Sequence, residues 1–284
     1  MIPSAFDYVA PESVSEALDA LGSESEEIKV LAGGQSLIPV LRLRLAAPTL
    51  LVDIGRIADL QGVRDDGDAL VIGALTTHHD VAHHPLIEQH AALLARAAET
   101  VADPQVRHRG TFGGALAHAD PAGDMPAAVV ALDAEMQIEG RNGRRVVPAV
   151  EFFSGLFTTV LAEDELLTGI RVPKHDGWGS HYEKFTRVAQ QWSIVAVAAA
   201  MRVADGRIMA AKVGLTNMGP TPIRATAVER ALVGQSASPD TVSAAAQHAA
   251  EGTSPPTDTN ADADFRRHLS TVLTRRAVLA AVGS

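Results

Sequence analysis

The order of apolar and polar residues predicts a mixture of short strands and short helices in the first part of the chain. In residues 13–21, Val14, Ala17, Leu18 and Leu21 fall on one helical face, and Ser13 precedes them as a capping residue. The same reasoning predicts helices at 37–43, 77–82 and 86–102, and strands or core segments at 28–31, 50–53, 70–72, 129–132, 135–138, 145–147 and 165–171.

A change in amino-acid composition near residues 173–180 predicts a boundary between two parts of the chain. This stretch is polar and glycine-rich, and two β-type segments follow it at 193–203 and 207–215, joined by the turn Asp205-Gly206. Helices are expected at 224–232, 239–250 and 264–281, with a loop at 253–260.

Composition narrows the possible functions. The 284 residues correspond to about two domains at roughly 100–200 residues each. The net charge of −10 argues against nucleic-acid binding, which needs a basic surface. The absence of cysteine excludes disulfides, thiol catalysis and cysteine-ligated metal centres from this chain. Since no apolar run is long enough to span a bilayer, a chain that does not span the membrane and lies in the cytoplasm is expected.

The first candidate binding segment is Ala32-Gly33-Gly34-Gln35-Ser36, between a predicted strand and a predicted helix. Glycines let a phosphate approach the backbone, and consecutive free N–H groups favour an anion. Taken alone, a tight turn without any ligand is an equally good interpretation. Asp53 lies 19 residues after Gly34, as in a Rossmann fingerprint, but the G-x-G-x-x-G spacing is absent.

The second candidate segment begins with Arg109-Gly110-Thr111-Phe112-Gly113-Gly114 and continues to Asp120 and Asp124. Its glycines and the Thr111 hydroxyl are expected to form another phosphate-sized cradle, and a carboxylate such as Asp124 can accept hydrogen bonds from sugar hydroxyls. The alternative is a glycine-rich loop whose aspartates cap a helix. Two such segments in one domain favour a long dinucleotide.

Two further clusters leave alternatives open. The histidines of residues 78–84 have spacings that can bind zinc on a helix, but no H-E-x-x-H pattern is present, so a solvated helix face is favoured. Trp192 either covers a ligand or packs where two domains meet. Without further context, Lys184 is expected to be an exposed lysine beside Glu183. No nucleophile–base pattern is found, so no catalytic residue and no metal ligand are assigned.

The two glycine segments together resemble the FAD signatures of the medium subunit of the carbon monoxide dehydrogenase and xanthine dehydrogenase family, which commonly read A-G-G-H/Q-S and T-I-G-G-N. The Asp120-Pro121 and Asp124-Met125-Pro126 motifs, the segment 182–185 and the layout of the last third are also similar. This sequence departs from the pattern at His108, Phe112 and Ala115, and Ala115 removes one side-chain contact.

The resemblance implies an FAD-binding domain of the vanillyl-alcohol oxidase and MurB type over residues 1–175, with subdomains 1–55 and 56–175. A smaller α+β domain over residues 176–284 follows. Non-covalent FAD is then expected to contact residues in and around both glycine segments, and Lys184 from the second domain. Carried over position by position, these are Lys29, Val30, Leu31, Ala32, Gly33, Gly34, Gln35, Ser36, Leu37, Thr111, Phe112, Gly113, Gly114, Ala115, His118, Asp124 and Lys184.

The resemblance also implies partners. A large subunit holds the molybdenum cofactor and a small subunit holds two [2Fe–2S] clusters, in a dimer of heterotrimers. This chain then takes electrons from the clusters and passes them through FAD to an external acceptor. Two alternatives remain at this stage: a stand-alone FAD oxidoreductase of the same fold, which would need a catalytic base, and a scaffold subunit without flavin.

Overall fold

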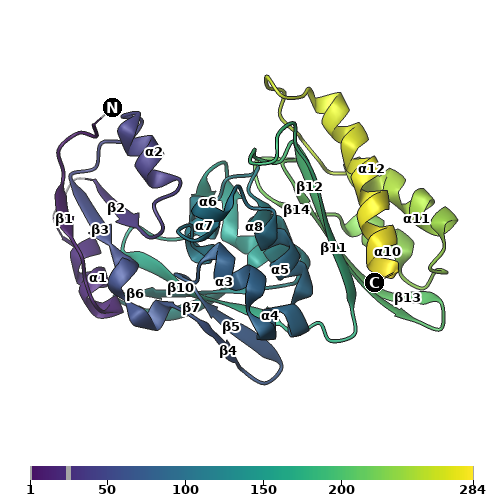
Figure 1. Cartoon of the computed structure of the whole chain (residues 1–284), viewed down its shortest axis with the longest axis horizontal. Helices are drawn as coiled ribbons and strands as arrows, with labels where there is room; N and C mark the ends of the chain where they lie inside the picture. Colours follow the sequence, from purple (N-terminus) through teal and green to yellow (C-terminus); the bar gives the residue numbers. More distant parts are fainter. Residues whose placement is uncertain (1, 24–26, 284) are drawn as a thin grey trace.

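The computed structural model describes residues 2–23 and 27–283, arranged as three successive layers along the long axis (Figure 1). The first layer is a parallel sheet of order β1-β3-β2, and the helices α1 and α2 belong to it. Its elements are β1 (Asp7–Val9), α1 (Val14–Leu21), β2 (Ile28–Leu31), α2 (Leu37–Arg42) and β3 (Leu50–Asp53). As predicted, Ser13 caps α1 by accepting a hydrogen bond from the N–H of Glu16.

The second layer is an antiparallel sheet of order β4-β5-β10-β6-β7, which packs against short helices. The strands are β4 (Val63–Asp65), β5 (Ala69–Gly73), β6 (Glu135–Gly140), β7 (Gly143–Pro148) and β10 (Glu165–Pro173), beside the hairpin β8 (Phe153–Gly155) and β9 (Thr158–Thr159). The helices are α3 (His78–His83), α4 (Pro85–His90), α5 (Ala92–Glu99), α6 (Pro104–Arg107), α7 (Phe112–His118), α8 (Asp124–Ala131) and α9 (Ala149–Phe152), with short 3₁₀ turns η1 (Ile54–Arg56) and η2 (Ala58–Leu60) before them.

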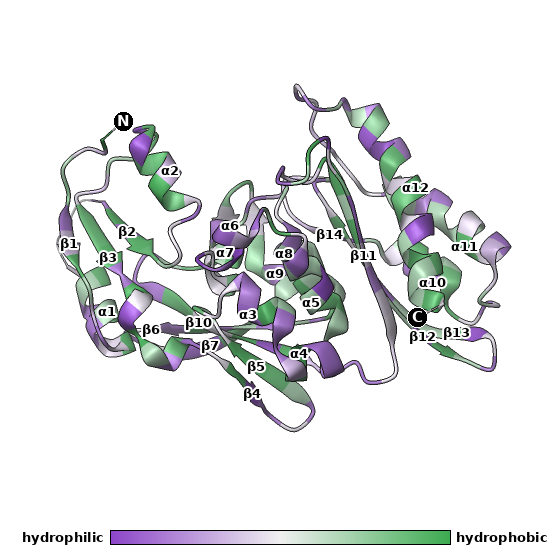
Figure 2. Cartoon of the chain, in the orientation of Figure 1, coloured by the Kyte–Doolittle hydropathy of each residue, from purple (hydrophilic) through white to green (hydrophobic). Residues whose placement is uncertain are grey.

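The third layer is an antiparallel sheet of order β11-β12-β13-β14 covered by C-terminal helices. Its elements are β11 (Gly179–Phe185), β12 (Val195–Ala204), β13 (Arg207–Thr216), β14 (Ile223–Arg224), α10 (Thr226–Leu232), α11 (Pro239–Ala246), η3 (Gln247–Ala250) and α12 (Ala263–Val282). The β12–β13 hairpin turns at Asp205 and Gly206, both with positive φ, as the predicted two-residue turn requires. In Figure 2, α12 is partly hydrophobic and partly hydrophilic, because one of its faces packs on the sheet.

Strand β12 is buried on both faces, and the alternation of its side chains assigns each face to a different core. Ala196, Ala198 and Ala200 join the core of the second layer, whereas Val195, Val197 and Met201 join the core under α12. The small side chains of the first face let α8 approach closely. At Gly214 of β13, an added Cβ would lie 2.2 Å from the Ala127 carbonyl oxygen. The third layer is therefore fixed firmly against the second.

The structure corrects two sequence predictions. Residues 129–132, expected as a strand or core segment, lie in the core but end helix α8 and form no strand. All eight residues of α8 are buried, and a helix without a polar face has no helical periodicity to detect. The single helix expected over 86–102 is two helices, α4 and α5, broken at Ala91 (φ −144°, ψ 45°). The carbonyl oxygen of His90 there accepts a 2.7 Å hydrogen bond from the His175 N–H, a contact that only the tertiary structure supplies.

Candidate functional site

A long cavity of about 590 Å³, here called the main cavity, runs from the first layer to the third. Its walls come from the turn after β2, the segment before and within α7, the start of α8, the end of β11 and the loop before β12. Apolar side chains such as Val101, Leu166 and Leu167 line part of it, while charged and amide side chains line the end toward the third layer. A long ligand with one polar and one flat apolar part matches such a lining.

The turn after β2 offers free backbone donors to this cavity. Within the described chain, the N–H groups of Gly33, Gly34, Gln35 and Ser36 donate no hydrogen bond to a backbone or side-chain acceptor. Gly34 has φ +77°, which a residue with a side chain adopts at a cost. Successive free N–H groups of a turn can form a concave anion site, so these four are available to the phosphate cradle that the sequence predicts.

The second glycine segment is built differently from the prediction. The N–H groups of Phe112 and Gly113 donate to the carbonyl oxygens of Thr76 and Ala74, both at 2.8 Å. The N–H of Gly114 donates to Thr111 Oγ1 as an N-cap of α7. These donors are already bonded, so the segment does not provide a second set of free N–H groups. It lines the cavity with the Thr111 hydroxyl and with backbone.

The glycines of the two segments serve close packing. A Cβ on Gly33 would lie 2.1 Å from the carbonyl oxygen of Arg109, and a Cβ on Gly113 would lie 2.4 Å from the Cβ of Ala74. Cβ atoms are not found at such distances, so alanine at Gly33 would push the two segments apart, and alanine at Gly113 would push the second segment away from Ala74. Glycine at these positions is therefore explained by close packing as well as by the approach of a ligand.

Asp124 and Lys184 pair with each other at the far end of the main cavity. Lys184 Nζ donates to Asp124 Oδ2 at 2.7 Å and to the Thr100 carbonyl oxygen at 2.9 Å. Asp124 Oδ1 accepts from the hydroxyls of Tyr182 and Ser193, both at 2.8 Å. The Lys184 side chain is 9% exposed, so the alternative of an ordinary exposed lysine is wrong.

Burial and charge set the ionisation of this network. Burial raises the pKa of the Asp124 carboxyl, and the Lys184 ammonium together with the hydroxyl donors opposes that rise. Burial and the nearby Asp124 charge raise the pKa of Tyr182 well above its ordinary value, so its hydroxyl stays a donor. An ammonium has three N–H bonds, and two of those of Lys184 are used within the chain. The third remains for a ligand in the cavity that Lys184 lines.

All the residues predicted to contact the cofactor line the main cavity except Leu31 and Phe112. Phe112 is fully buried in the core of the second layer, where its side chain anchors α7. Trp192 lines the cavity with 53% of its surface exposed, which does not fit the interpretation of a packing residue. Its neighbour Gln191 also lines the cavity, and Gln191 Oε1 is buried without a hydrogen-bond partner among the described residues.

Several lining residues were not predicted. Ala102 and Phe157 both have positive φ, an uncommon backbone conformation for residues with side chains. Phe157 sits in the β8–β9 turn with its ring 5.2 Å from that of His118. Neither residue type signals such a conformation in the sequence. Many of the other unpredicted lining residues are apolar positions on distant segments, among them Ile54, Leu75, Val106, Leu161, Leu166 and Leu167, and polar residues such as His78, Asp120, Glu165 and Gln190 also line the cavity.

The histidines of residues 78–84 do not form one solvated face. His83 is exposed, whereas His78 is 4% exposed and lines the main cavity. The rings of His79 and His108 stack with centroids 3.9 Å apart. Within the described residues, no group of three or more potential ligands is placed to hold a metal ion. Across residues 2–23 and 27–283, no helix has both the length and the apolar character needed to cross a membrane.

Burial of His78 predicts a specific pH dependence of stability. Burial, with a smaller effect of the nearby Arg107 charge, lowers the pKa of His78 to about 4. Below pH 6.5 the unfolded chain takes up a proton at this position that the folded chain does not. Stability therefore falls as the pH drops toward 4. Relative to a His78→Asn variant, the chain should lose about 2 kcal/mol more unfolding free energy between pH 7.5 and pH 5.

Equilibrium urea unfolding of both isolated chains at the two pH values measures this difference. The other histidines are present in both proteins, so their contributions cancel in the comparison. If the two chains lost the same unfolding free energy between pH 7.5 and pH 5, His78 would take up a proton as readily in the folded chain as in the unfolded chain, and the prediction would be wrong.

Comparison with known proteins gives consistent matches over the whole chain. Residues 4–175 match the family described as the FAD binding domain in molybdopterin dehydrogenase, and residues 180–281 match the CO dehydrogenase flavoprotein C-terminal domain. The carbon monoxide dehydrogenase medium chain of Hydrogenophaga pseudoflava is 42% identical over 282 residues, covering 99% of this chain and 98% of the relative. The glyceraldehyde dehydrogenase medium chain of Sulfolobus acidocaldarius is 37% identical over 277 residues, covering 98% of each.

A solved structure also resembles this chain over its full length. The carbon monoxide dehydrogenase from Hydrogenophaga pseudoflava that lacks the Mo-pyranopterin moiety of the molybdenum cofactor aligns with a TM-score of 0.97 and 43% sequence identity. The alignment covers 100% of this chain and 99% of that chain. The three-layer arrangement is therefore shared over its full length.

Proposed function

This chain belongs to the family of FAD-binding medium subunits of molybdenum hydroxylases, and from that premise we propose that the main cavity holds FAD between the turn after β2 and the loop before β12. The four free N–H groups of Gly33 to Ser36 would bind the diphosphate. Lys184 and Trp192 would lie at the flavin end, because they line the cavity at its opposite limit.

The observation that carries this proposal is the set of unsatisfied groups along one cavity. The N–H groups of Gly33–Ser36, the buried His78 Nδ1 and the buried Gln191 Oε1 have no partner in the described chain, and all belong to residues that line the main cavity. Buried polar atoms are normally hydrogen-bonded, so these groups fit a long polar ligand. The cofactor-binding residues that we assign are the predicted ones without Leu31 and Phe112.

The flavin supplies the redox chemistry, since it accepts electrons singly and releases them as a pair. The chain supplies binding and electrostatics. Lys184, held by Asp124 and the Thr100 carbonyl oxygen, places a fixed positive charge where an electron-rich ring would be stabilised. Tyr182 and Ser193 hold Asp124 in place and keep that charge oriented. Trp192 has an exposed flat ring system that would shield a bound flavin from water.

The chain acts as an electron-transfer subunit of an oxidoreductase. We propose partners of two kinds: a large subunit with the molybdenum cofactor and a small subunit with [2Fe–2S] clusters, assembled as a dimer of heterotrimers in the cytoplasm. The absence of cysteine supports this division, because iron–sulfur clusters in the system need ligands from another chain. The two similar medium chains bear names with different substrates, carbon monoxide and glyceraldehyde, which supports a substrate chosen by the large subunit.

We also propose two domains, residues 1–175 and 176–284, with the first divided near residue 55. The main division is supported by the family matches, because the first ends at residue 175 and the second begins at residue 180. The segment between β10 and β11 lies at the same place in the chain. Asp124 and Lys184 lie on opposite sides of this division. Their ion pair therefore links the two domains at the cofactor.

The test is the absorption spectrum of the protein co-expressed with its partner subunits, followed by release of the chromophore with heat or acid. We expect about one FAD per chain, since one cavity has the required donors. An assembled, folded complex without flavin would contradict the proposal and leave a scaffold subunit as the function.

A further inference from the structure

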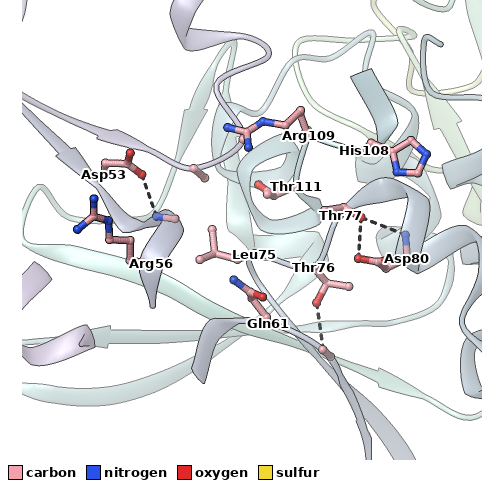
Figure 3. Close-up of a pocket in the computed structure, with 14 residues that line it drawn as sticks. Asp53, Arg56, Gln61, Leu75, Thr76, Thr77, Asp80, His108, Arg109 and Thr111 are labelled. Carbon is pink, nitrogen blue, oxygen red and sulfur yellow. Dashed lines mark hydrogen bonds between the residues drawn. The ribbon is translucent and has the colours of Figure 1, made fainter. Parts of the chain in front are cut away.

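The loop before β12 is held in place by distant parts of the chain. Near the contact of the two glycine segments, by contrast, hydrogen bonds such as Asp53 to the Gly55 N–H and Thr77 to Asp80 join residues no more than three positions apart (Figure 3). The loop of residues 190–194 is here called the Trp192 loop. In the described chain, its hydrogen bonds that involve a side chain join it to residues at least 24 positions away.

A buried arginine makes one of these distant bonds. Arg266 of α12 has 0% of its surface exposed, and its Nη1 donates to the carbonyl oxygen of Ile194 in the Trp192 loop. Its Nη2 donates to Asp258 Oδ2 at 2.7 Å. An arginine is almost never fully buried unless it is paired, because its charge loses contact with water. The guanidinium group thus joins a carboxylate to the backbone just beyond Trp192.

The same carboxylate extends this support to the residue before Trp192. Asp258 Oδ1 accepts from the N–H of Asn260 at 2.8 Å. The turn so formed presents Asn260 Oδ1, which accepts from Gln191 Nε2 at 3.2 Å. Arg266 and Asp258 therefore support the Trp192 loop on both sides of the tryptophan.

Trp192 depends on these neighbours for its position. Its indole N–H donates no hydrogen bond within residues 2–23 and 27–283, and 53% of its surface is exposed. A side chain of this kind keeps several rotamers unless the surrounding structure restricts it. Arg266 does not line the main cavity, so it touches no ligand there.

A separate set of bonds ties the Trp192 loop to the second layer. Ser193 Oγ donates to Asp124 at 2.8 Å, and Asn217 Nδ2 donates to the Ser193 carbonyl oxygen at 2.8 Å. These bonds do not involve Arg266. Loss of the Arg266 side chain therefore leaves the partners of Lys184 in place and affects the part of the loop that carries Trp192.

We propose that Arg266 is a positioning residue for the flavin, which holds Trp192 against the ring through the Ile194 carbonyl oxygen and the Asp258 turn. This role rests on the proposed function, in which the flavin lies beside Trp192. A tryptophan that is already held in place loses little conformational entropy when FAD binds, so Arg266 favours binding without touching FAD. A lysine would keep the charge but lacks the planar fork that faces two acceptors.

The first measurement is the fluorine NMR spectrum of the full-length chain labelled with fluorotryptophan. The chain has two tryptophans, Trp178 and Trp192, and the Trp192→Phe variant identifies the signal of each. In Arg266→Met, the Trp192 signal should move at least about halfway to its position in the urea-unfolded chain, while the Trp178 signal stays. A general loss of structure would move both signals.

Arg275→Met is the matched control, because Arg275 also lies on α12 but is exposed and donates to Ser243. It should leave both signals unchanged, and Arg266→Lys should restore part of the original position of the Trp192 signal. A Trp192 signal that Arg266→Met leaves in place, or that lies at the unfolded position in the unsubstituted chain, would overturn the positioning role.

The second measurement is the rate at which FAD leaves the complex with the partner subunits. Arg266→Met should raise this rate roughly fivefold, because the contact between two aromatic ring systems is weakened. In a Trp192→Leu background the same substitution should add nothing, because both changes act on one contact. An equal increase in both backgrounds would show that Arg266 does not act through Trp192, and would overturn the proposal.

The two measurements also separate this role from the proposed function. An unsubstituted complex without FAD would contradict the proposed function and the role of Arg266 toward the flavin. The fluorine spectrum, which needs no FAD, would still decide whether Arg266 positions Trp192. A displaced Trp192 signal with an unchanged rate of FAD loss would overturn only the role toward the flavin.

Discussion

Asp124→Ala is expected to lower the unfolding free energy of the chain by about 3–5 kcal/mol and to leave the assembled complex with little FAD. The variant leaves the Lys184 ammonium buried without its counter-charge, and the hydroxyls of Tyr182 and Ser193 lose their acceptor. Breaking a buried pair from one side is costly because the remaining charge stays desolvated. The ammonium that we place at the flavin also loses its orientation.

Urea unfolding of the isolated chain measures the stability loss, and the flavin absorbance of the purified complex measures retention. Asp124→Asn keeps one acceptor oxygen for the hydroxyls but removes the charge, so an intermediate effect is expected. Asp264→Ala is the matched control, because Asp264 pairs with Arg267 while 94% exposed, and such pairs contribute little. Stoichiometric FAD in Asp124→Ala would show that the ion pair does not position the cofactor.

Gly33→Ala is expected to empty the main cavity of FAD and to cost about 1–3 kcal/mol of stability. The new Cβ would lie 2.1 Å from the Arg109 carbonyl oxygen and 2.8 Å from the Gly110 Cα. Both neighbours are backbone atoms, so the two glycine segments must separate. Separation displaces the free N–H groups that we assign to the diphosphate, although none of them is removed by the substitution.

The matched control is Gly155→Ala in β8, where a Cβ would meet Thr158 only at 3.8 Å, an ordinary contact. FAD per chain and the urea midpoint, compared between the two variants, test whether the effect is local to the glycine contact. A Gly33→Ala complex with full FAD would mean that the contact between the two glycine segments can shift without disturbing the cradle. The importance assigned to this contact would then be wrong.

Some features of the fold were predictable because local chemistry determines them. The apolar face of residues 13–21 and its Ser13 cap gave α1, and Asp205-Gly206 between two β-type segments gave the β12–β13 hairpin. The failures arise where burial and distant contacts decide the local structure. Helix α8 is buried on all sides and leaves no periodic pattern, and the break between α4 and α5 lies where a distant segment donates a hydrogen bond, which no local pattern shows.

At the proposed cofactor site, too, some features follow from the sequence and others only from the tertiary structure. The sequence by itself determined the positions of the two glycine segments and their resemblance to FAD signatures. Glycine marks these positions because only a residue without a side chain lets the backbone come so close to another backbone segment or to a ligand. Only the tertiary structure decided that the free donors belong to the first segment and that Lys184 is buried on Asp124. The physical reason is that hydrogen-bond satisfaction and burial depend on residues far apart in the chain, which no local pattern specifies.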